Sequence, residues 1–174
     1  MVTNHKFTYN LSGQKIYEAI LDNTNKNGKG KYYRYCHENS LYSASDEQKN
    51  LPSDIVLTAI RNGSEYVTDN IELIYDTDTH YMQPTQIKKY CIDSPISIGH
   101  ILIRNSIINL GRSNSSVSTS YEYNDQYRLT DVISEGNRRI SYIWDNDFNN
   151  ITRKEINASI NSYVYTWKDM VGLT

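Results

Sequence analysis

Long apolar runs are missing from this sequence. The most apolar stretch, Ile96 to Leu110, is interrupted by polar residues, and no run reaches the roughly eighteen apolar residues that indicate a membrane-spanning helix. We therefore expect no membrane span. The N-terminal residues 1–6 also lack the apolar region of a signal peptide.

Charge of one sign and cysteine are scarce as well. Eighteen basic and twenty acidic residues give a formal net charge of −2, too little to hold a nucleic-acid backbone, so no nucleic-acid partner is expected. Cys36 and Cys91 are the two cysteines, which make neither a disulfide framework nor a zinc site. We expect two buried thiols, although a single bridge between them stays open.

The abundant residues are those of β-sheets and turns. The 174 residues, enough for one domain of ordinary size, include sixteen Tyr, twenty Ile and thirteen Thr, which fit a pleated, half-buried surface. Nineteen Asn and eighteen Ser supply turns, whereas Pro and Gly number three and eight. This balance predicts an all-β fold and argues against a helical bundle.

A motif recurs along the chain: an aromatic-x-aromatic start, a polar turn, and an apolar residue, in the C-terminal copies followed by Thr. The three C-terminal copies start 21 and 23 residues apart. An N-terminal copy and a weaker one precede them, and no copy is recognised between Asn23 and Asn70. The copies are Tyr121–Thr130, Tyr142–Thr152, Tyr165–Thr174, Phe7–Ile16 and Ile74–Thr79.

Each copy reads as a β-hairpin. Residues two apart on a strand share a face, so Tyr121 and Tyr123 point the same way, as do Tyr142 and Trp144. Asn, Asp and Gly then form a tight turn before a second strand returns. A single hairpin is only marginally stable in water, so the units must stack side by side into a larger sheet of antiparallel hairpin repeats.

These units resemble the YD repeat of RHS proteins, whose pattern is approximately Tyr-x-Tyr-Asp-x-x-Gly-Arg-Leu-Thr. Asn124 stands where the pattern has Asp, Tyr127 where it has Gly, and Lys168 where the last copy would have Asp. The resemblance is clearest over residues 121–174 and extends to 5–22 and 71–90. The residues that carry the repeat are Phe7, Tyr9, Gly13, Tyr121, Tyr123, Arg128, Leu129, Thr130, Tyr142, Trp144, Asp145, Tyr165, Trp167, Leu173 and Thr174.

The last copy is most similar to repeats of insecticidal Tc toxin B and C components, and similar repeats occur in polymorphic toxins. The resemblance implies a spiralling β-sheet that closes into a hollow shell around a toxic C-terminal effector. It implies further YD-repeat strands or other toxin-complex subunits as partners, and a secreted or extracellular location as part of a bacterial toxin. A complete shell needs many hundreds of residues, so we expect this chain to be a fragment.

The expected organisation has three parts. Residues 1–110 form a YD-like β-rich segment with long loops, 111–120 a Ser/Asn-rich loop or linker, and 121–174 three YD-type units. A stretch from Pro52 to Ile60 is compatible with either a short helix or a strand.

Other residue groups suggest chemistry only weakly. Asp76, Asp78 and His80 alternate and would share a strand face, but Asp76 also stands where the YD pattern expects its turn Asp. The neighbours Cys36 and His37 would point to opposite faces, and nothing sets the separation that a carboxylate pair with Glu72 would need. We therefore expect no enzyme, no catalytic residue, no metal and no cofactor. The alternative to a structural shell segment is a surface or carbohydrate-binding module that uses exposed Tyr and Trp.

Overall fold

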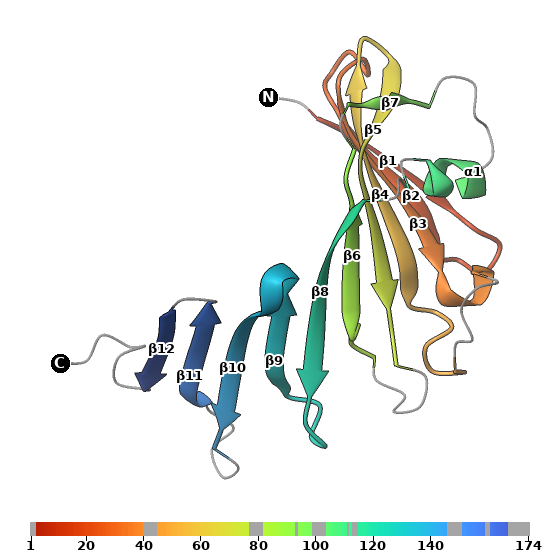
Figure 1. The fold of residues 1–174 in the computed structure, drawn as a ribbon. Coiled ribbons are helices and arrows are strands. Elements are labelled where there is room, and N and C mark those ends of the chain that lie inside the picture. The colour runs from red at the N-terminus through yellow and green to blue at the C-terminus, as the bar shows by residue number, and fades with distance from the viewer. Residues whose placement is uncertain are drawn as a thin grey trace. The chain divides into compact units, whose positions relative to one another are not determined.

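The computed structural model describes residues 3–39, 45–76, 82–92, 94–98, 104–110, 112, 115–145, 151–158 and 161–166. It is mostly antiparallel β-sheet, which confirms the predicted all-β fold (Figure 1). The chain divides into two compact units. The first comprises Met1–Gln83 and Ile87–Val117, and the second comprises Pro84–Gln86 and Ser118–Thr174.

The first unit is built on a sheet with the strand order β1-β2-β3-β4-β5-β6, and β7 pairs with β5. A short 3-10 turn, Cys36–Glu38, follows β3, and the helix α1 follows β7. The strands are β1 (Asn4–Tyr9), β2 (Lys15–Leu21), β3 (Gly28–Tyr35), β4 (Pro52–Arg61), β5 (Ser64–Ile74), β6 (Gln86–Tyr90) and β7 (Ile96–Ser97), and α1 is Arg104–Asn109.

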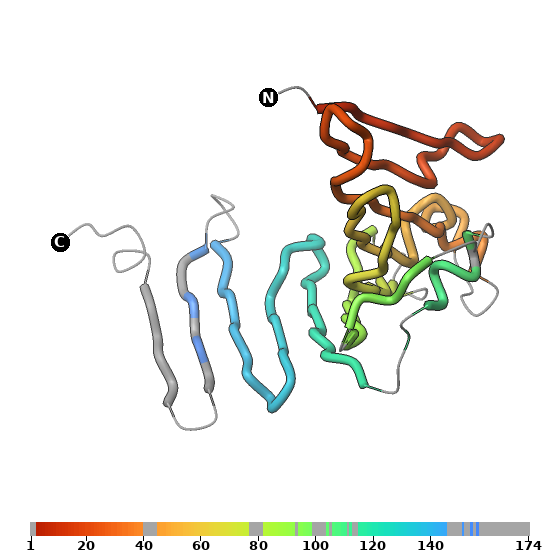
Figure 2. The backbone as a smooth tube through the Cα atoms, turned by 90° about the horizontal axis from the view of Figure 1, so that it is seen from above, coloured from red at the N-terminus to blue at the C-terminus, as the bar shows by residue number. Residues whose placement is uncertain are grey.

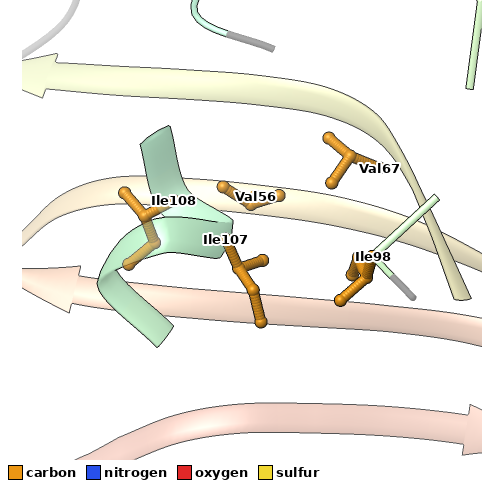
Figure 3. Close-up of a cluster of buried hydrophobic side chains, with 5 residues drawn as sticks. All are labelled: Val56, Val67, Ile98, Ile107 and Ile108. Atoms are coloured by element: carbon orange, nitrogen blue, oxygen red, sulfur yellow. The ribbon is translucent and has the colours of Figure 1, made fainter. Parts of the chain in front are cut away.

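One face of this sheet carries the hydrophobic core. Ile107 and Ile108 of α1 pack with Val56 of β4, Val67 of β5 and Ile98 (Figure 3). In β4 burial alternates for most of the strand, because residues two apart share a face. Residues 52–61 are thus a strand, which settles the choice that the sequence left open.

The second unit is an antiparallel meander of β8 (Ser116–Tyr123), β9 (Leu129–Ser134), β10 (Arg138–Trp144), β11 (Ile151–Ala158) and β12 (Asn161–Thr166). Figure 2 follows the backbone back and forth through β8, β9 and β10. Residues 116–120 of the Ser/Asn-rich segment belong to β8. Across the described residues of both units, no helix is long and apolar enough to cross a membrane.

Candidate functional site

Among the residues that the structure describes, four hairpins share one distortion of their strand pairing. In each, the last aromatic of the first strand lies opposite the first residue of the second strand. The residue before that aromatic lies opposite the third residue of the second strand, so the second residue of that strand has no partner. We call the first strand outgoing and the second strand the return strand. The four end pairs are Tyr9 with Lys15, Tyr35 with Pro52, Tyr123 with Leu129, and Trp144 with Ile151.

The skipped residue forms a β-bulge, which bends the return strand and interrupts its ladder of hydrogen bonds. It is Thr130 and Thr152 in two of the C-terminal copies, and Ser53 in the β3–β4 hairpin. In these two copies, the Leu or Ile near the end of the sequence motif is therefore the first residue of the return strand, and the Thr after it forms the bulge.

The β3–β4 hairpin corrects the sequence analysis, which recognised no unit between Asn23 and Asn70. Tyr33-Arg34-Tyr35 is its aromatic-x-aromatic start, and Pro52 begins its return strand. The connection between them is long and holds the 3-10 turn, with Cys36 N–H donating to Leu51 O at 2.9 Å. Because this insertion replaces the short turn, the motif is broken in the sequence, and Tyr33-x-Tyr35 is its remaining signal.

The two short turns are built in the same way. Asn10 Oδ1 accepts the backbone N–H groups of Ser12 and Gln14, and Asn124 Oδ1 accepts those of Gln126 and Arg128, all at 2.9–3.0 Å. The side-chain amide thus does the work that the YD pattern assigns to Asp, because either side chain can accept from the backbone of a turn. Each turn also contains a backbone hydrogen bond between residues three apart: Gly13 N–H donates to Asn10 O, and Tyr127 N–H donates to Asn124 O.

The fourth residue of each turn has a left-handed backbone. Gly13 has φ of 76° and Tyr127 has φ of 60°. A side chain in this conformation costs about 1–2 kcal/mol, whereas glycine adopts it freely. Gly13 therefore adopts the turn without strain, whereas Tyr127 is strained in it.

We predict that exchanging the residues at these positions changes stability in opposite directions. Gly13→Ala should lower the free energy of unfolding by about 1 kcal/mol, since no atom lies within 4 Å of the added Cβ and only backbone strain acts. Tyr127→Gly should raise it by about 0.5 kcal/mol, because the relieved strain exceeds the entropy cost of glycine. Urea unfolding of both variants checks the pair, and a loss of stability in Tyr127→Gly would contradict it.

A second repeated contact joins one hairpin to the next. The polar tip of an aromatic at the end of one strand, or directly after it in the case of Tyr75, donates a hydrogen bond to a backbone carbonyl at or just before the start of a neighbouring strand. We call this contact the aromatic latch. The four latches are Tyr35 Oη to Lys15 O at 2.8 Å, Tyr75 Oη to Pro52 O at 2.9 Å, Tyr123 Oη to Pro84 O at 3.0 Å, and Trp144 Nε1 to Leu129 O at 2.7 Å.

Three of the four acceptors have a common position. Lys15, Pro52 and Leu129 are the first residues of β2, β4 and β9, next to the bulge, whereas Pro84 lies two residues before β6. A bulge interrupts the ladder locally, and the polar tip of a buried or half-buried Tyr or Trp favours a hydrogen-bond partner. Each latch supplies that partner, at about 0.5–1.5 kcal/mol for the hydrogen bond.

A buried aspartate also recurs. Asp54 and Asp131 both stand two residues after the start of their return strands. Asp54 is fully buried and binds Arg34 Nε at 2.7 Å, while Arg112 reaches its other oxygen. Asp131 binds Arg139 Nε at 2.6 Å. Ionisable residues thus do recur with the repeat, but as carboxylates neutralised by arginines.

The arginine contact gives Asp131 a pH dependence. Hydrogen bonds from Arg139 and, more weakly, Ser141 hold the pKa of Asp131 below its ordinary value. Its contribution is therefore complete above the unfolded-state pKa near 4, and is lost as pH falls through the lower folded-state pKa. We predict that Asp131→Asn lowers the free energy of unfolding by about 1–3 kcal/mol at pH 7. Urea unfolding at several pH values should show this gap closing in acid, and a gap independent of pH would contradict the assignment.

A carboxylate enclosed by hydroxyls lies on the first unit. Glu65 accepts hydrogen bonds from Thr58 Oγ1 at 2.5 Å and Tyr32 Oη at 2.9 Å. Burial, followed by the Glu65 charge, raises the pKa of Tyr17 to about 12, so this neighbouring hydroxyl stays protonated. A Cβ at Gly30 would lie 2.4 Å from Thr58 Oγ1 and 2.5 Å from Glu65 Oε1, so any larger residue here would displace these two side chains. Both oxygens of the Glu65 carboxylate thus accept hydrogen bonds from side chains of the same sheet, beside a hollow of 280 Å³.

The proposed thiol and metal residues are not brought together. Cys36 is buried and burial raises the pKa of its thiol to about 12, while His37 binds Lys49 O through Nδ1. Cys91 is exposed, which corrects the expectation of two buried thiols, and Cys36 and Cys91 form no disulfide. Asp78 and His80 lie outside the described residues. Within the described part, no three His, Cys, Asp or Glu side chains are grouped as a metal site would require.

The remaining repeat residues are placed as follows. Phe7 lies in β1, Tyr121 in β8, Tyr142 in β10 and Tyr165 in β12, with Asp145 directly after β10. Arg128 lies over the Trp144 ring, 5.7 Å from its centroid, and donates to Asp145 O at 3.3 Å. Trp167, Leu173 and Thr174 lie outside the described residues. The sequence matches no protein-family model and no curated protein.

Proposed function

We propose that this chain is a non-catalytic structural segment of an RHS/YD-repeat toxin shell. The observation that carries the proposal is the aromatic latch, found four times among the described residues, each time between an aromatic near the end of one strand and a carbonyl at or just before the start of another. A latch joins a hairpin to the strand beside it, so repeated latches would build a sheet to which further hairpins can be added. The YD resemblance supplies the larger context, in which such a sheet encloses a C-terminal effector outside the bacterial cell.

The recurring side chains support a structural role. Aromatic residues form the latches, Asn closes the turns, Thr or Ser occupies most of the bulges, and the recurring aspartates are neutralised by arginines. None of these recurring groups combines a nucleophile with a base and an orienting partner, the arrangement that covalent catalysis uses. The partners proposed are further YD-repeat strands of the same shell or other subunits of a toxin complex.

The test is electron cryo-microscopy of the protein expressed together with the coding sequence that flanks this chain. The proposal predicts that the hairpins form consecutive parts of the wall of a hollow shell, and that a downstream segment inside it resists protease. Hairpins that form a solid domain, with no enclosed polypeptide, would contradict the proposal.

A second candidate function, carbohydrate binding, is favoured by one hollow of the second unit. Its volume is 520 Å³, and its lining is Tyr127, Arg128, Leu129, Tyr142, Trp144 and Ile151. Aromatic rings of this kind pack on the apolar faces of sugars. A glycan array probed with the intact chain tests this candidate: Tyr142→Ala should abolish binding, whereas Tyr121→Ala, outside the hollow, should preserve it. Absence of sugar binding by the intact chain would rule it out.

A further inference from the structure

The strand β1 lies at one end of the strand order and is exposed along its whole length. All six residues are exposed, including Phe7 at 48% and Tyr9 at 57%. One edge of β1 pairs with β2, and the other has no neighbouring strand among the described residues. An open edge with exposed aromatic side chains is a template for another strand.

Tyr9 occupies the same position as three of the residues that form latches, Tyr35, Tyr123 and Trp144. It is the second aromatic of its outgoing strand, faces the first return residue Lys15, and precedes the same turn as Tyr123. Nevertheless, the Tyr9 hydroxyl has no hydrogen-bond partner within the described part of the chain. Tyr35, Tyr75, Tyr123 and Trp144 all have one.

We propose that β1 is a docking edge for the return strand of another hairpin of the same repeat, whose first carbonyl accepts the Tyr9 hydroxyl. This proposal rests on the proposed function, since it takes the latch as the interface between repeat units. The kind of strand that would pair with β1 follows from how the other outgoing strands pair. Strands β3 and β10 are outgoing, and each pairs antiparallel with a return strand, β2 and β9 respectively. The strand β5, which leads to the latch residue Tyr75, pairs in the same way with the return strand β4.

The same rule excludes the β12 edge of a second copy as the occupant. The sequence motif makes β12, which carries Tyr165, an outgoing strand like β1. In an antiparallel pair, the Tyr9 end of β1 would lie beside the start of β12, where the pairing of Asn161 with Ala158 shows no bulge. The partner is therefore an antiparallel return strand that begins at a bulge, as β9 does at Leu129.

The probe is a peptide of residues 121–134, cyclised because an isolated hairpin is marginal in water. Its second strand is β9, with the Leu129 carbonyl as the latch acceptor. We expect the labelled peptide to bind the intact chain in fluorescence anisotropy, and the β1 amide resonances to shift in NMR spectra. Tyr9→Phe should weaken binding about twofold to tenfold, the worth of one hydrogen bond.

Two controls separate the latch from non-specific binding to the edge. Tyr127→Phe in the intact chain, which removes the hydroxyl of another exposed tyrosine, should leave the affinity for the peptide unchanged. A peptide with an ester in place of the Leu129–Thr130 amide has a weaker acceptor and should lose affinity for the wild type but not for Tyr9→Phe. No binding, resonance shifts confined to β12, or equal affinity for Tyr9→Phe would overturn the proposal. The peptide assay needs no shell or effector, so its failure is distinguishable from failure of the shell proposal.

Discussion

Asp54→Ala should lower the free energy of unfolding by about 3–5 kcal/mol, because it leaves buried arginine charge without its partner. Asp54 is fully buried between Arg34 and Arg112, and Ser53 Oγ donates to it at 2.6 Å. The Arg34 side chain is only 9% exposed, so water cannot replace the lost carboxylate. Urea unfolding followed by circular dichroism measures the loss.

Asp69→Ala is the matched control. Asp69 pairs with Lys89 at 2.6 Å, but the lysine side chain is 61% exposed. Ion pairs at the surface contribute about 0–1 kcal/mol, so this variant should stay near wild-type stability. Equal losses of stability in Asp54→Ala and Asp69→Ala would contradict the claim that Asp54 neutralises buried arginine charge.

Ile108→Ala should cost about 2–5 kcal/mol. Ile108 is fully buried and anchors α1 on Val56 of β4, so truncation removes apolar contacts and leaves a cavity (Figure 3). The Ile108 carbonyl also accepts Asn70 Nδ2 at 2.6 Å, so displacement of the helix would expose a buried amide. Ile20→Ala, at a side chain that is 52% exposed, is the control and should cost far less. Calorimetric melting of both variants checks the difference, and similar melting temperatures would contradict this core.

The sequence was sufficient to predict the hairpins, because their signal is local. Aromatic-x-aromatic pairs followed by Asn are complete within about ten residues, and β8–β9 and β10–β11 form where the motif places them. The short turns follow from the same local chemistry. Their Asn side chains bond backbone amides two and four residues ahead, a contact that needs no distant partner.

The latches and the core could not be predicted, because they depend on register and on distant residues. Tyr75 reaches Pro52, and Arg112 reaches Asp54, only after several strands have paired. Nor does the sequence pattern reveal α1, whose six residues are too few to show helical periodicity. Its burial comes from the sheet beneath it. The Tyr33-x-Tyr35 unit was missed for a different reason, since its long insertion separates the two halves of the motif.

The most direct test of the account is a set of four tyrosine-to-phenylalanine variants, three at latch residues and one at Tyr9, compared by urea unfolding. Each variant keeps the ring and removes only the hydroxyl. Tyr35→Phe, Tyr75→Phe and Tyr123→Phe should each lose about 0.5–1.5 kcal/mol, because each removes the hydrogen bond to a backbone carbonyl of a neighbouring strand or its approach. Tyr9→Phe should match the wild type, since the Tyr9 hydroxyl has no hydrogen-bond partner in the described chain. Equal effects in all four variants, or no loss in the three latch variants, would contradict the claim that aromatic latches join the hairpins.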